Sequence, residues 1–223
     1  SLKDLMMFYS STQKKLTTLK EYVERMKEDQ KCIYYAAGES IAAVDKLPQT
    51  ELLKDKDYEV LYLTGETDEF VLQALMNYDE KPFRSIVDGD LELGDEEEHK
   101  DDSESAELMQ FVKETLGDQV ASVRLSNKLV SSAVCLSTEG GVTLEMERYF
   151  KSMPGAPTDI RAIRVLELNA NHHAYQAMKE AFDAGDKDKA ARIAKILHAQ
   201  ALLIAGEPLE DPAAYSELVC TLI

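Results

Sequence analysis

The first clear pattern of apolar and polar positions predicts an amphipathic helix that ends near Lys27. Apolar side chains recur there at spacings of three and four residues, as on one face of a helix. Thr18 and Glu21 stand in the relation of a capping box at its start. The apolar face consists of Leu16, Leu19, Tyr22, Val23 and Met26.

Three runs rich in β-formers alternate with helical stretches over the next sixty residues. One helical stretch begins near Ser40 and is interrupted at Pro48. A second covers residues 68–78. Strands separated by helices favour right-handed crossovers and parallel pairing. The pattern therefore predicts a small three-layer αβα domain with a short parallel sheet. Its strands are expected at residues 32–36, 59–63 and 83–87.

The second half of the chain has the pattern of an α+β domain. A helix with one apolar face stops at Gly117, and two runs of β-formers follow at residues 120–126 and 133–138. Because the segment between these runs is short, they are expected to form a hairpin. One more strand is expected at residues 165–168, and the chain beyond Asn169 has the pattern of helices.

A strongly acidic segment separates the two halves. Residues 88–107 contain 11 acidic residues and a single basic one, Lys100, which gives −10 of the total formal charge of −17. Such a segment buries too little apolar surface to offset its ordering entropy. The sequence therefore predicts a domain at residues 1–93, an acidic linker at 94–106 and a second domain at 107–223.

Net charge and cysteine content narrow the function classes. The charge of −17 argues against nucleic acid and anionic membrane partners, which need a basic surface. Cys32, Cys135 and Cys220 are too far apart for a CxxC pair, so neither a disulfide framework nor a zinc site is expected. The chain has no signal peptide or membrane-spanning run, so a cytoplasmic location is expected. It starts without an initiator methionine, as a piece of a longer protein would.

Catalytic and metal-binding patterns are weak. His172 and His173 are adjacent, and adjacent side chains on a helix do not face each other. His198 lies within an apolar helix, which favours packing over catalysis. Phosphate-loop and nucleophile-elbow motifs are missing. We therefore expect no catalytic residue, no metal and no cofactor in this chain.

The segment of residues 142–153 forms an amphipathic helix with two methionines and two aromatic rings. One interpretation is an ordinary helix that faces the core. The other is an adaptable protein-binding face, because methionine and aromatic side chains suit promiscuous apolar contacts. Its apolar side chains are Val142, Met146, Tyr149, Phe150 and Met153.

The two helices at the end of the chain carry more apolar surface than one short neighbour covers. They span residues 187–205 and 212–222, with Asp211 as N-cap and Pro212 at the first helical position. One interpretation is an intrachain core. The other is a two-fold homodimer that pairs both helices in a four-helix bundle. Its predicted interface is Ile193, Ile196, Leu197, Leu203, Tyr215, Leu218, Val219 and Leu222.

Four longer stretches of the chain resemble two adjoining domains of one known protein family. LTTLKEYVERMKEDQKCIYYAAGES and YEVLYLTGETDEFVLQALMNYDEKPF are similar to the end of the family's middle domain. LGDQVASVRLSNKLVSSAVCLST and ALLIAGEPLEDPAAYSELV are similar to its C-terminal domain. These stretches resemble the C-terminal half of bacterial-type heat-shock protein 90 chaperones. The resemblance covers nearly the whole chain apart from the acidic segment.

The resemblance implies specific roles. ATP and magnesium would bind in an N-terminal domain outside this chain, so the fragment would have no ATPase activity. The client-contacting helix of the family matches residues 142–153, which implies client contacts at Val142, Met146, Tyr149 and Phe150. Phe70 stands where bacterial members have a tryptophan; it keeps the apolar ring but loses the indole donor. The second domain would form the homodimer.

Three hypotheses of function follow. The first is a chaperone module that dimerises and binds unfolded or partly folded clients. The second is a small α/β enzyme domain fused to a helical dimerisation module. A test for nucleotide binding would distinguish it from the first hypothesis. The third is a purely structural dimerisation protein, which would not suppress aggregation.

Overall fold

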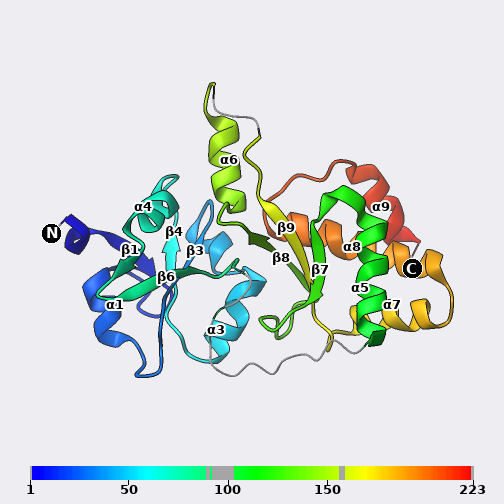
Figure 1. Cartoon of the computed structure of the whole chain (residues 1–223), viewed down its shortest axis with the longest axis horizontal. Helices are drawn as coiled ribbons and strands as arrows, with labels where there is room; N and C mark the ends of the chain where they lie inside the picture. The colour runs from blue at the N-terminus through cyan, green and yellow to red at the C-terminus, as the bar shows by residue number, and fades with distance from the viewer. Residues whose placement is uncertain (1, 89–90, 92–102, 156–158, 222–223) are drawn as a thin grey trace. The chain divides into compact units, whose positions relative to one another are not determined.

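A computed structural model describes residues 2–88, 91, 103–155 and 159–221 (Figure 1). The chain forms two compact units, each assembled from two segments. The first unit consists of residues 1–95 and 138–162, and the second of residues 96–137 and 163–223. Residues 138–162, which the sequence places in the second domain, thus pack with the first unit. Most of the predicted linker lies outside the described residues, and a helix already begins at Ser103.

The first unit is built on a six-stranded mixed sheet with the order β2-β1-β4-β3-β6-β5. The three inner strands β4, β3 and β6 are parallel, whereas the outer pairs are antiparallel. The outer strands were not expected from the sequence. The strands are β1 (Met7–Ser10), β2 (Leu16–Thr18), β3 (Ile33–Ala37), β4 (Leu61–Leu63), β5 (Asn77–Tyr78) and β6 (Lys81–Ser85).

Helices cover both faces of this sheet. On β3, Ile33 and Tyr35 face one apolar cluster, and Tyr34 and Ala36 face the other. A strand buried on both sides loses the polar alternation of an exposed strand. The helical elements are η1 (Leu2–Leu5), α1 (Leu19–Arg25), α2 (Ile41–Val44), η2 (Pro48–Thr50), α3 (Glu51–Asp55), α4 (Asp68–Leu75) and α6 (Leu144–Ser152).

Local signals place several helix ends correctly. Thr18 and Glu21 form the predicted capping box at the start of α1, and Ser40 caps α2. The predicted apolar face of the first helix is wrong at Leu16. This residue lies in the edge strand β2, where its side chain is 58% exposed. Leu16 has helical spacing to Leu19 only by chance, because it belongs to the strand that precedes the helix.

The second unit combines a three-stranded sheet with four helices in its described part. The sheet order is β7-β9-β8, and β7 runs parallel to β9. The hairpin expected from residues 120–138 is therefore wrong, because β9 lies between the two strands. The elements are α5 (Ser103–Leu116), η3 (Gly117–Gln119), β7 (Ser122–Leu125), β8 (Val134–Glu139), β9 (Ile163–Leu168), α7 (His173–Asp183), α8 (Lys187–Ile204) and α9 (Pro212–Cys220).

A buried ionic cluster lies in the second unit. The ammonium group of Lys128 is 3.3 Å from Oε1 of Glu167, and both side chains are about 1% exposed. Arg124 also pairs with Glu167 at 2.7 Å, and Ser126 donates to its other oxygen at 2.8 Å. Burial alone raises the pKa of Glu167, but Lys128 and the hydrogen bonds outweigh burial and hold it below its usual value.

Candidate functional site

Three aromatic rings from two distant segments form a cluster in the first unit. The ring of Phe70 in α4 lies 5.1 Å from that of Tyr149 and 5.4 Å from that of Phe150, both in α6. The rings of Tyr149 and Phe150 are 6.1 Å apart. These spacings suit tilted and edge-to-face aromatic packing. All three side chains are half-buried, so each ring keeps an exposed part.

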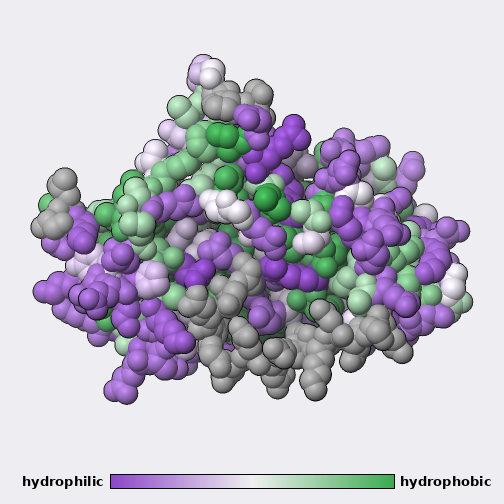
Figure 2. Space-filling view, in the orientation of Figure 1, coloured by the Kyte–Doolittle hydropathy of each residue, from purple (hydrophilic) through white to green (hydrophobic). Residues whose placement is uncertain are grey.

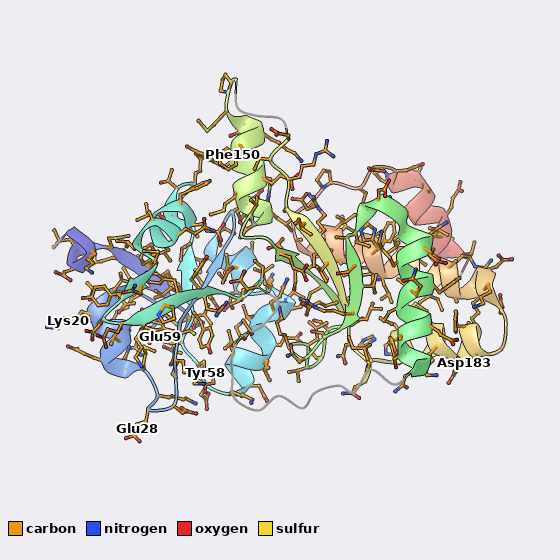
Figure 3. The ribbon with its side chains drawn as sticks, in the orientation of Figure 1. Lys20, Glu28, Tyr58, Glu59, Phe150 and Asp183 are labelled. Atoms are coloured by element: carbon orange, nitrogen blue, oxygen red, sulfur yellow. The ribbon has the colours of Figure 1, made fainter. Side chains whose placement is uncertain are left out.

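The two helices that carry the cluster also have exposed apolar side chains. Val71 in α4 and Met153 at the end of α6 are both exposed. Figure 2 shows apolar surface along α6 in its view of the molecule, and Phe150 is labelled on α6 in Figure 3. Contiguous exposed apolar patches on a protein mark sites of interaction.

Polar contacts fix α6 against α4. The hydroxyl group of Thr143, the N-cap of α6, donates to the Glu69 carboxyl group at 2.5 Å. Nε2 of Gln73 donates to the carbonyl oxygen of Gly141 at 2.9 Å. One oxygen of Glu147 accepts from the backbone N–H of Ala162 at 2.8 Å. The start of α6 is therefore held on α4, and its middle is tied to the backbone at Ala162.

A cavity of about 370 Å³ opens beside the aromatic cluster. Its walls come from the loops after β3 and β4, from the start of α4 and from α6. Phe70 and Tyr149 line it together with the buried carboxyl group of Glu69. Desolvation by burial raises the pKa of Glu69 to about 7.

The structure brings the predicted client-contact residues into one unit. Phe70, Tyr149 and Phe150 are partly exposed, and Val142 lies half-buried just before α6. The outcome differs at Met146, whose side chain is only 3% exposed. Its sulfur lies 3.5 Å from Nε2 of Gln73. Met146 is therefore not itself an exposed contact.

The predicted dimer residues fall into two groups. Ile193, Ile196 and Leu197 are buried in the second unit, where α8 packs against α5 and α7. Their assignment to an interface is wrong, because neighbouring helices of the same chain already cover them. Leu203 is 50% exposed. Three residues of α9 are half-buried, Tyr215, Leu218 and Val219; Leu222 lies outside the described residues.

Sequence reasoning missed Glu69 and Arg148. Glu69 precedes Leu72 by three residues, so it shares the inward face of α4. The sequence signal that could have identified Glu69 is a carboxylate on the apolar face of a helix. Arg148 pairs with Glu145 at 2.5 Å and with Glu39 at 3.3 Å, and Glu39 lies more than a hundred residues away in the chain.

Neither metal-binding nor membrane-spanning features are found in the described part of the chain. No group of three or more His, Cys, Asp or Glu side chains there is arranged to hold a metal ion. Nor does any described helix have the length and apolar character needed to cross a membrane. The three cysteines are free, two of them buried.

Comparison with known proteins identifies the family. The family model described as Hsp90 protein matches residues 1–223. The chain belongs to the Hsp90 family. Proteins named chaperone protein HtpG are similar over the whole of this Hsp90-family chain, with 49% identity in Clostridium acetobutylicum, 47% in Clostridium perfringens and 48% in Halalkalibacterium halodurans. The chain spans 36% of the length of each of these relatives. It is thus part of a chaperone family.

Proposed function

We propose that this chain is the C-terminal half of a bacterial-type Hsp90 chaperone, acting in the cytoplasm, and that it binds unfolded or partly folded client proteins. The observation that carries the proposal is the partly exposed cluster of Phe70, Tyr149 and Phe150. Broad apolar rings can contact many different sequences. A client surface needs this tolerance, because unfolded proteins share apolar side chains rather than one motif.

Binding of a permanently unfolded protein tests this function. Reduced and carboxymethylated α-lactalbumin, labelled with a fluorophore, serves as the probe, and anisotropy reports binding to the full chain. Replacing Phe70 and Phe150 together with Ala should weaken binding about tenfold or more, since truncating a hot-spot residue costs about 2 kcal/mol or more. The matched control is Leu16→Ala, which removes an exposed apolar side chain outside the cluster. Equal loss in both variants, or no loss in either, would contradict the proposal.

The proposal includes a homodimer formed through α8 and α9, in which both helices of each chain join an intermolecular four-helix bundle. Leu203 and Ile204 at the end of α8 are exposed, and α9 adds three half-buried apolar residues. A two-fold interface would bury this surface, and two-fold dimers are the commonest oligomers.

We also propose that ATP and magnesium bind outside this chain. The cavity beside α6 is lined by four glutamates and one arginine, and carboxylates repel the phosphates of a nucleotide. The cavity therefore does not fit a nucleoside triphosphate. Titration calorimetry of the full chain with magnesium ATP should give no stoichiometric heat. A micromolar affinity would favour the alternative, an α/β enzyme domain.

A further inference from the structure

The cavity lies at a position where open α/β sheets carry a crevice. β3 and β4 are adjacent and parallel, and their carboxyl ends lead into Gly38 and Thr64, which both line the cavity. The chain after β3 continues to helices on one face of the sheet, and the chain after β4 continues to α4 on the other. Loops that diverge in this way leave a space between the strand ends. Here α6 closes one side of that space.

The walls of this cavity are acidic. Glu39, Glu66, Glu69 and Glu145 line it, and Arg148 is the one basic residue among its lining residues. The guanidinium group of Arg148 is engaged with two of these carboxylates, Glu39 and Glu145. The cavity therefore has an excess of negative charge.

Glu69 is the carboxyl group whose position calls for a cation. Its side chain is 96% buried, since only 4% of its surface is exposed. Its hydrogen-bond partner is the neutral hydroxyl of Thr143, and no lysine or arginine of the described residues forms an ion pair with it. A buried carboxylate without a cation costs free energy, and a cation supplied by a ligand would offset that cost.

The aromatic wall suits the rest of a basic side chain. Phe70 and Tyr149 line the same cavity as Glu69. Arginine and lysine have long aliphatic stems that pack on apolar surface, and their charged ends are attracted to aromatic faces. Arginine also stacks on rings through its planar group.

We propose that this cavity binds an arginine or lysine side chain of a client segment, with the charged end against Glu69 and the stem against Phe70 and Tyr149. The proposal rests on the client-binding function proposed above and deepens it. The preferred client segment carries a basic residue next to apolar residues, which contact the exposed part of the aromatic cluster.

A pair of fluorescent peptides tests the preference. Both are eleven-residue peptides with phenylalanine and leucine around the central position, which is arginine in one and citrulline in the other. Citrulline has nearly the same shape and lacks the charge. At pH 8 the arginine peptide should bind the full chain about tenfold more tightly, because hydrogen bonds between charged groups are stronger than those of neutral ones.

Two variants locate the effect. Glu69→Gln keeps an acceptor for the Thr143 hydroxyl and should reduce the preference for arginine to about twofold or less. Glu28→Gln is the matched control and should leave the preference unchanged. Glu28 is exposed in the first unit and lies far from Phe150 in Figure 3.

The outcomes separate the two proposals. Equal affinities of the wild-type chain for both peptides, or an unchanged preference in Glu69→Gln, would overturn the cationic preference. If Phe70→Ala weakens both peptides in that case, the client-binding function still stands. If neither peptide binds the wild-type chain, the client-binding function itself fails.

Discussion

The hydroxyl group of Thr143 makes two hydrogen bonds, one to α4 and one within α6. It donates to the Glu69 carboxyl group at 2.5 Å and accepts from the backbone N–H of Met146 at 3.2 Å. The first bond satisfies a buried acid, and the second caps a helix. One small side chain thus fixes where α6 begins and where it lies on α4.

Replacing Thr143 with Val should weaken the attachment of α6 to α4. The variant keeps the shape but loses the cap and the partner of a buried carboxyl group, so the free energy of unfolding of the first unit should fall by about 1–3 kcal/mol. Urea unfolding followed by tyrosine fluorescence measures this, because eight of the ten tyrosines lie in that unit. Thr143→Ser, which keeps the hydroxyl, is the control. Equal stability of the Val and Ser variants would contradict this role.

Glu69 should make the stability of the first unit depend on pH. Its folded pKa of about 7 lies above the usual glutamate value of 4.5, so the folded state binds the proton more tightly than the unfolded state. This contribution is fully present below pH 4.5 and is lost as the pH rises through about 7. Relative to Glu69→Gln, the wild type should therefore lose about 3 kcal/mol between pH 4.5 and 8.

Urea unfolding of both proteins at several pH values measures this difference in stability. The other titrating groups contribute equally to both proteins, so their contributions cancel. Besides burial, nearby charges act on the Glu69 pKa. Glu145 and Asp88 raise it, and Arg148 lowers it. A constant difference between the two proteins across this range would contradict the prediction. The same titration should make the arginine peptide bind more weakly at pH 6 than at pH 8.

Removing Lys128 should strongly destabilise the second unit. Lys128→Met leaves the Glu167 carboxylate buried with one cation fewer, and breaking a buried ion pair from one side costs about 3–5 kcal/mol. The double variant Lys128→Met with Glu167→Leu should regain much of this loss. Far-UV circular dichroism during urea unfolding follows α5, α7 and α8. Lys179→Met, at an exposed pair with Asp183, should change stability by about 0.5 kcal/mol or less.

The homodimer should depend on the apolar residues at the ends of α8 and α9. Leu203→Asp and Leu218→Asp would each place two carboxylates in the proposed interface, one from each chain, where an unpaired charge is costly. Both variants should sediment as monomers at micromolar concentration, and the wild type as a dimer. Ser216→Asp adds a charge at an exposed polar position of α9 and should stay dimeric. A monomeric wild type would rule out this interface.

Sequence by itself determined what depends on neighbouring residues. The capping box of Thr18 and Glu21 and the order of Asp211 and Pro212 set helix starts, because their partners lie within one helical turn. The spacing of the apolar side chains in residues 142–153 predicted an amphipathic helix for the same reason. The resemblance of long stretches to one chaperone family likewise required no tertiary structure.

Tertiary structure decided which distant residues meet. β7 pairs with β9 rather than with β8, and residues 138–162 pack with the first unit; periodicity gives a strand or a helix its apolar face but not its partner. The burial of Met146 and the salt bridge between Lys128 and Glu167 were also decided by tertiary structure. So does the cavity at Glu69, since its walls come from four segments that only folding brings together. A buried charge is stable only where such partners converge, and local sequence carries no record of that convergence.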